Sequence, residues 1–170
     1  MKKAIIVTGS VATGKTKLSK ALAKKHDYEY LNITSFIKQN KLSDGYDKKR
    51  KCEIIDIKKL NHFLIKQINN TKKTLIIDGH LSHYLPPRYV KKCYITTCEI
   101  KTLNTRLKKR KYPNSKIQEN LQVEIFQLPL MEAQKKYKNK KHNKIKKKYK
   151  NKKNKTTPIK LIDTTKGVKV

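Results

Sequence analysis

Residues 9 to 16 combine the residue types that hold phosphate groups. They read GSVATGKT and fit the spacing G-x4-G-K-[ST]. In this arrangement the backbone N–H groups of the loop surround phosphate oxygens, Lys15 places its ammonium between the terminal phosphates, and Thr16 coordinates Mg²⁺. A plain glycine-containing turn is the alternative, but an apolar run precedes the match and a helical pattern follows it, as a phosphate-binding loop requires. The spacing therefore predicts nucleotide binding.

A second candidate group lies at the end of the apolar run TLIID. Its last residue, Asp78, has the position from which proteins with this loop hold a carboxylate near Mg²⁺, directly or through water. An aspartate that ends a strand is also often a cap, so position alone leaves both roles open. His80, two residues later, could orient water or a phosphate, although a single histidine is more often a surface or core-edge residue.

Arginine is rare in this lysine-rich chain, with four arginines against forty lysines. Arg106 and Arg110 are four residues apart, so a helix presents both on one face. A guanidinium group can pair with two phosphate oxygens through its forked N–H groups. We therefore expect this pair to neutralise a transferring phosphoryl group when a mobile segment closes; two solvated helix charges are the alternative.

The elements that must position these residues alternate along the chain. The predicted strands are Ala4 to Thr8, Tyr28 to Asn32, Thr74 to Asp78, Lys92 to Thr96 and Ile159 to Asp163. The predicted helices are Lys15 to Lys25, Thr34 to Gln39, Lys58 to Ile68, Ile100 to Lys109 and Lys116 to Tyr137, the last one bent or interrupted at Pro129. Strands that alternate with helices predict an α/β protein, with a five-stranded parallel sheet covered by helices on both faces.

Length and charge limit the remaining possibilities. A chain of 170 residues fits a single domain with a real core. The net charge of +32 predicts salt-sensitive attraction to polyanions such as RNA; a solvated surface shaped by codon bias is the competing explanation. Three cysteines without a C-x-x-C pair suit a reducing cytoplasm. We expect neither a signal peptide nor a membrane span, because no apolar run approaches about 18 residues.

The motifs, taken in order, resemble those of the adenylate kinase isoenzyme 6 family of P-loop NTPases. The matching segments are TGSVATGKT, YLNITSF, SDGYD, IIDGHLSHYLP followed by Arg88, TRLKKRKY and IQENLQVEIFQ, which together span roughly residues 4 to 137. The combination of SDGYD, the D-x-H step and ENLQVEIFQ separates this branch from ordinary adenylate kinases.

The resemblance implies a role for each segment. ATP phosphates would lie on the loop from Gly9 through Ala12 and Gly14 to Thr16, with Lys17 as the next contact. The segment that binds the nucleoside monophosphate (NMP) would span about residues 32–55, and the lid about 109–119, with Arg110 as the lid arginine. Asp78 and His80 match an altered Walker B step linked to ATP hydrolysis. Lys166 resembles a residue of the adenine-edge loop.

Two departures from the family pattern stand out. The family loop usually reads G-T-P-G-V-G-K-T, whereas here Ala12 replaces the middle glycine, adding a methyl group and restricting φ. Residues 135–155 are almost all Lys and Asn with interleaved tyrosines, which predicts disorder or an arm that becomes ordered on binding RNA.

The sequence therefore predicts an enzyme that transfers the terminal phosphate of ATP reversibly to AMP or another NMP, with Mg²⁺, and that also hydrolyses ATP. The resemblance implies late maturation of the small ribosomal subunit and of its rRNA 3′ end, through a uS11-type ribosomal protein. Two alternatives stay open: an assembly factor driven by ATP hydrolysis whose kinase activity is vestigial, and an RNA-binding module with a decayed nucleotide site.

Overall fold

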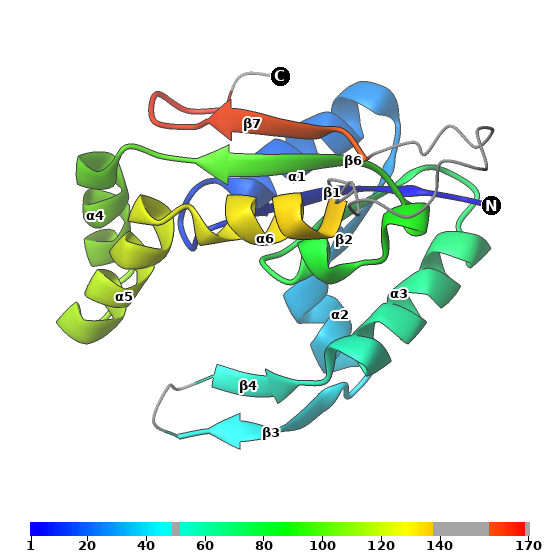
Figure 1. The fold of residues 1–170 in the computed structure, drawn as a ribbon, viewed down its shortest axis with the longest axis horizontal. Helices are drawn as coiled ribbons and strands as arrows, with labels where there is room; N and C mark the ends of the chain where they lie inside the picture. Colours follow the sequence, from blue (N-terminus) through cyan, green and yellow to red (C-terminus); the bar gives the residue numbers. More distant parts are fainter. Residues whose placement is uncertain (49–51, 138–156, 169–170) are drawn as a thin grey trace, which may run out of the picture.

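A five-stranded parallel sheet forms the centre of the protein (Figure 1). The computed structural model describes residues 1–48, 52–137 and 157–168. The strands are β1 (Ala4–Gly9), β2 (Glu29–Asn32), β5 (Leu75–Asp78), β6 (Val90–Thr97) and β7 (Ile159–Asp163). Their order across the sheet is β2-β5-β1-β6-β7, so β1 and β5 lie inside it and every residue of both strands is buried.

Helices cover both faces of the sheet. The helices are α1 (Lys15–His26), α2 (Ile33–Gln39), α3 (Ile57–Asn70), α4 (Ile100–Lys109), α5 (Asn114–Ile125) and α6 (Leu128–Tyr137). Successive residues of a strand point to opposite faces. Ile5 and Val7 of β1 accordingly pack with α1, whereas Ala4 and Ile6 belong to the cluster that contains residues of α2, α3 and α6.

The helices α4 and α5 lie beyond the carboxyl ends of β6 and β7 (Figure 1). Leu103 and Leu107 of α4 and Ile117 and Leu121 of α5 form a third apolar cluster, which includes Ala12 from the loop after β1. This packing fixes α5 against the segment that the sequence identifies as a phosphate-binding loop.

A small antiparallel hairpin extends from the sheet beside α2 and α3 (Figure 1). It consists of β3 (Ser43–Asp47) and β4 (Cys52–Ile55). The sequence analysis did not predict these strands, because their residues are mostly exposed and lack a regular alternation of apolar and polar types. With α2, the hairpin makes up the segment predicted to bind the monophosphate.

The prediction of five parallel strands between helices is confirmed, with strand ends shifted by at most two residues. The prediction of one helix from Lys116 to Tyr137 is wrong in detail. The break comes before Pro129, at Phe126 and Gln127, where Gln127 has a φ of 49°. Pro129 instead lies in the first turn of α6, where its missing N–H has no helical partner to lose.

Among the described residues, no helix has both the length and the apolar character needed to cross a bilayer. The predicted Lys/Asn-rich arm at 135–155 lies outside the described residues from 138 onwards.

Candidate nucleotide-binding site

The loop between β1 and α1 wraps around its own lysine. The Lys15 ammonium donates hydrogen bonds to the carbonyl oxygens of Gly9 at 3.1 Å and Ser10 at 2.7 Å. A Cβ at Gly9 would lie 2.5 Å from the Thr96 carbonyl oxygen, so only glycine lets β1 approach β6 this closely. Gly14, with a φ of 84°, turns the chain into α1.

Ala12 adopts a left-handed backbone conformation, with a φ of 64°. This conformation costs an alanine about 1–2 kcal/mol relative to glycine. Its methyl group is buried in the apolar cluster of α4 and α5, and that burial offsets part of the cost. The extra methyl group of Ala12 is therefore accommodated by packing against α4 and α5.

The loop opens onto a cavity of about 500 Å³ at the carboxyl edge of the sheet. Its lining comes from the loop, α1, the end of β2, the start of α2, the end of β5 with the segment that follows it, and the end of α4: Val11, Ala12, Gly14, Lys15, Thr16, Lys17, Lys20, Asn32, Thr34, Asp78, Gly79, His80 and Arg110. The cavity thus gathers at one place most of the residues singled out by the sequence, and its lining includes several cations.

Strand register brings Asp78 to the loop. In the sheet, Asp78 lies opposite Val7 of β1 on one side and Asn32 of β2 on the other. Its Oδ2 accepts hydrogen bonds from the Thr16 hydroxyl at 2.7 Å, the Tyr30 hydroxyl at 2.8 Å and the Asn32 amide at 3.1 Å. These three donors fix the orientation of the carboxylate.

The second carboxylate oxygen of Asp78 suits a metal ion. Oδ1 is buried and has no hydrogen-bond partner among the described residues. A buried carboxylate oxygen without a partner is costly, and together with the adjacent Thr16 hydroxyl it supplies hard oxygen donors of the kind that Mg²⁺ takes. The residues present therefore fit a Mg²⁺ ion.

The electrostatic state of Lys15 reflects its enclosed position. Burial lowers the pKa of its ammonium to about 8, while Asp78 acts in the opposite direction and Arg110 adds to the lowering. An anion placed in the cavity would favour the charged ammonium, because opposite charges at short distance stabilise each other. The loop is therefore arranged to gain from a phosphate.

The two candidate arginines have different surroundings in the structure. Arg110, the residue that ends α4, lines the cavity. Arg106 does not line it: its guanidinium donates to the carbonyl oxygens of Thr164 at 2.7 Å and Thr165 at 3.2 Å, in the loop after β7. Arg106 is therefore held by backbone acceptors of the loop after β7 in this structure, and its expected action on the phosphate when a mobile segment closes stays a prediction.

The loop after β7 also contacts the phosphate loop directly. The Thr164 hydroxyl donates to the Thr13 carbonyl oxygen at 2.7 Å, and a Cβ at Gly14 would lie 3.5 Å from Thr164. Lys166 is exposed and does not line the cavity. The contact of Lys166 with ATP that the resemblance implies stays a prediction.

Three residues of the site were not found from the sequence: Tyr30, Asn32 and Glu124. The buried Glu124 of α5 accepts from the Ser10 hydroxyl at 2.5 Å and from the Cys98 backbone N–H at 2.9 Å. A strand-end position could have indicated Asn32. Tyr30 and Glu124 act across 48 and 114 residues, and local pattern carries no signal for such contacts.

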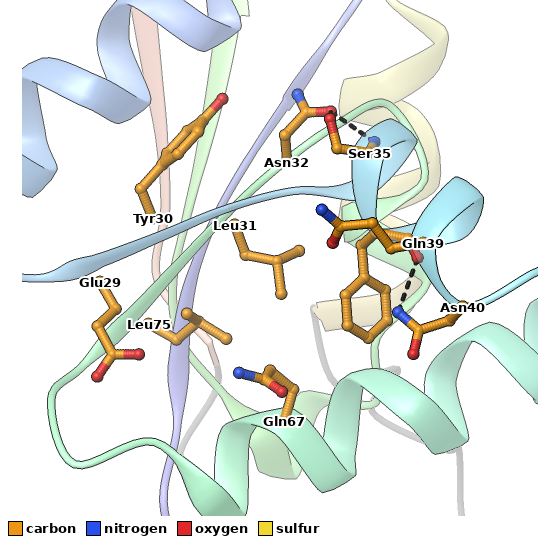
Figure 2. A pocket seen from close by; sticks show the side chains of 10 residues that line it. Glu29, Tyr30, Leu31, Asn32, Ser35, Gln39, Asn40, Gln67 and Leu75 are labelled. Atoms are coloured by element: carbon orange, nitrogen blue, oxygen red, sulfur yellow. Dashed lines mark hydrogen bonds between the residues drawn. The ribbon is translucent and has the colours of Figure 1, made fainter.

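A second cavity, of about 480 Å³, lies on the other side of β2 (Figure 2). Gln39 of α2 and Gln67 of α3 extend toward it from two helices. Asn32 lines both cavities, and Tyr30 lines this one while its hydroxyl holds Asp78. The two side chains therefore form part of the wall between the two spaces.

Comparison with known proteins identifies the family. The family profile described as "AAA domain" matches residues 5–127. The adenylate kinase isoenzyme 6 homolog FAP7 of Saccharomyces cerevisiae is 36% identical over 137 residues, which cover 78% of this chain and 67% of that protein. The chain belongs to the adenylate kinase isoenzyme 6 family.

A second member of this family, the adenylate kinase isoenzyme 6 homolog of Dictyostelium discoideum, is 34% identical over 138 residues, covering 79% of this chain and 75% of that protein. Among solved structures, a sugar kinase from Janibacter matches with a TM-score of 0.51 at 12% identity, covering 96% of this chain and 86% of that one. This structural likeness concerns the fold alone. The chain is thus an adenylate-kinase-like P-loop protein.

Proposed function

We propose that this protein transfers the terminal phosphate of ATP reversibly to AMP or another NMP and also hydrolyses ATP. The observation that carries the proposal is a pair of neighbouring cavities that share two residues. The phosphate-loop cavity and a third cavity, of about 350 Å³ between α2 and β4, are both lined by Thr34 and His80. A donor and an acceptor could therefore meet at these two side chains.

The cavity between α2 and β4 has the character of a base-binding site. Its other lining residues come mainly from α2, β4 and the start of α3, and include Ile33, Ile37, Lys38, Cys52, Glu53, Ile55, Ile57 and Leu81. Ligand sites are commonly apolar with a few polar groups. An NMP with its base among these side chains would direct its phosphate toward His80 and the loop.

The side chains and backbone of this protein promote phosphate transfer by positioning the substrates and by neutralising phosphate charge. Lys15 and the loop N–H groups hold the β and γ phosphates of ATP, and Arg110 neutralises charge on the transferring group. Glu124 fixes the start of the loop through Ser10. Thr16 and Asp78 would hold Mg²⁺, which would supply positive charge to the phosphate oxygens. The acceptor phosphate attacks in line, so no covalent enzyme intermediate is needed.

A coupled assay of ATP with AMP tests the proposal. ADP should form well above the rate of ATP hydrolysis alone. Lys15→Ala should reduce ADP formation on the order of a hundredfold, because a charge-stabilising donor is lost, whereas Lys24→Ala, on the exposed side of the same helix, should not. Equal rates with and without AMP would instead favour an assembly factor driven by ATP hydrolysis, with vestigial kinase activity.

We further propose that the protein acts in the cytoplasm in late maturation of the small ribosomal subunit and the 3′ end of its rRNA, together with a uS11-type ribosomal protein. Membership of the family and the net charge of +32 support this role. Repeating the assay with purified small-subunit particles tests it, and an unchanged rate of ATP hydrolysis would speak against it.

A further inference from the structure

A buried histidine contacts the residue that precedes the phosphate loop. That residue, Thr8, points to the same face of the sheet as Ala4 and Ile6, which is the face that α6 helps to cover (Figure 1). The Thr8 hydroxyl lies 2.9 Å from Nδ1 of His83. His83 belongs to the short 3₁₀ helix Ser82–Tyr84 and is only 3% exposed. An enclosed imidazole therefore lies beside the start of the loop, and the mechanism proposed above does not use it.

Two residues of α6 hold this histidine from the other side. Nε2 of His83 lies 2.8 Å from Oε2 of Glu132. The other carboxylate oxygen of Glu132 accepts a hydrogen bond from the Tyr84 hydroxyl at 3.1 Å, which fixes the orientation of the carboxylate. The Tyr137 hydroxyl donates to the His83 carbonyl oxygen at 2.8 Å. The helix α6 thus fixes both the ring and the backbone of His83.

These contacts decide which ring nitrogen of His83 carries the proton. An ionised carboxylate can only accept hydrogen bonds, so Nε2 must donate to Glu132. Burial lowers the pKa of His83, Glu132 acts in the opposite direction and Lys136 adds to the lowering, so the ring is neutral at neutral pH. In a neutral ring with its proton on Nε2, Nδ1 is an acceptor, and the Thr8 hydroxyl donates to it. The hydrogen bonds therefore run in one direction, from Thr8 through His83 to Glu132.

The opposite tautomer would fit this surrounding poorly. It would place the lone pair of Nε2 against the Glu132 carboxylate, and Nδ1 would donate to Thr8. The Thr8 hydroxyl would then have to turn its own proton to the His80 carbonyl oxygen, which lies farther away, at 3.3 Å. The charge of Glu132 therefore selects the tautomer that holds Thr8 at the shorter distance.

The phosphate loop is anchored by residues that are far apart in the chain. Glu124 of α5 accepts from the Ser10 hydroxyl, and the Thr164 hydroxyl donates to the Thr13 carbonyl oxygen. The contact between Thr8 and the imidazole adds an anchor next to the first residue of the loop. Donor groups that are already oriented stabilise phosphate charge without a cost of reorganisation. An anchor at this point should therefore strengthen nucleotide binding.

We propose that His83 is a positioning residue of the nucleotide site. Fixed by Glu132 with its proton on Nε2, it accepts the Thr8 hydroxyl and holds the start of the phosphate loop in the arrangement that binds ATP. His83 does not line the phosphate-loop cavity, so it acts through Thr8 and does not touch the nucleotide. The inference rests on nucleotide binding at this loop, as in the proposed function, but it does not depend on transfer to AMP.

Nitrogen-15 NMR of the protein without nucleotide at neutral pH tests the tautomer, because protonated and unprotonated ring nitrogens have different chemical shifts. We expect the proton of His83 on Nε2 alone. Glu132→Gln removes the charge that selects this tautomer, so the other tautomer should appear and the amide signals of Gly9 and Ser10 should shift. Glu99→Gln, which changes an exposed carboxylate at the start of α4, should leave all these signals in place. A proton on Nδ1 in the unsubstituted protein, or loop signals that do not respond to Glu132→Gln, would overturn the proposal.

Calorimetric titration with ATP measures the consequence for binding. Glu132→Gln and Thr8→Val should each weaken ATP binding about fivefold, the loss expected of one hydrogen bond, whereas Glu99→Gln should not. The two substitutions together should cost no more than either alone, because both break the same chain of hydrogen bonds. Losses that multiply would place Thr8 and Glu132 on separate paths and overturn the coupling. The ring and loop signals are read without nucleotide, so they decide this inference even where transfer to AMP fails.

Discussion

At the scale of single residues, Asp78 shows how the site separates the roles of two atoms of one carboxylate. Three donors converge on Oδ2, from Thr16, Tyr30 and Asn32, while the buried Oδ1 has no partner among the described residues. Hydrogen bonds to a charged group contribute about 1.5–3 kcal/mol when the group is otherwise buried. Oδ2 is therefore committed to structure, and Oδ1 is available to a cation.

Tyr30→Phe tests this separation. The substitution removes one of the three donors and leaves the ring, so Asp78 should be held less firmly and Mg²⁺-dependent nucleotide affinity should fall by about 1 kcal/mol. Calorimetric titration with ATP in Mg²⁺ and again in EDTA measures the effect. Tyr28→Phe, which alters a ring stacked on His26, is the matched control. An equal loss of affinity in EDTA would contradict the assignment.

His80 lines both the phosphate-loop cavity and the cavity between α2 and β4. Its substitution can therefore distinguish ATP hydrolysis from phosphate transfer to AMP. If His80 orients the attacking water beside Asp78, His80→Ala should reduce ATP hydrolysis more than transfer to AMP, because AMP brings its own positioned nucleophile. Parallel assays with and without AMP give the ratio. Equal loss in both reactions would rule out this division of roles.

At the scale of elements, the junction of α5 and α6 depends on one strained residue. Gln127 has a φ of 49°, and its N–H donates to the Glu124 carbonyl oxygen at 3.0 Å, which closes α5. Helices commonly end with a left-handed residue, most often glycine, at this position. The junction sets the direction in which α6 returns across the sheet.

Gln127→Gly should therefore stabilise the protein by about 1 kcal/mol, because glycine adopts this conformation without the steric cost. Chemical denaturation measures the change in the free energy of unfolding. Gln122→Gly, at an exposed position within α5, should destabilise by a similar amount, since glycine weakens a helix interior. A loss of stability in Gln127→Gly would show that the side chain contributes more than its backbone strain costs.

At the scale of the whole molecule, basic residues far outnumber acidic ones, with 44 Lys+Arg against 12 Asp+Glu. Against a net charge of +32, the ion pairs among the described residues are Lys59–Asp44, Lys73–Asp27 and His83–Glu132. The first two are exposed pairs of small energetic value. Repulsion between like charges therefore opposes folding.

Salt should accordingly stabilise the fold. Raising KCl from low to moderate concentration shortens the screening distance and weakens repulsion between lysines, so the melting temperature should rise by several degrees. Thermal denaturation followed by circular dichroism measures it, with sucrose at equal osmolality as the control for solvent effects. A melting temperature that is constant or falls with KCl would show that ion pairs outweigh repulsion.

Local patterns were enough to predict the five strands and most of the helices, and to single out the phosphate-loop segment and Asp78 as candidates, because each depends on periodicity or on a fixed spacing within a few residues. The folded arrangement was needed to find that Tyr30 donates to Asp78, that Ser10 donates to Glu124, and that Arg106 donates to the loop after β7. Those contacts join segments far apart in the chain. Sheet order and helix packing bring them together, and neither is encoded in the residues next to each partner.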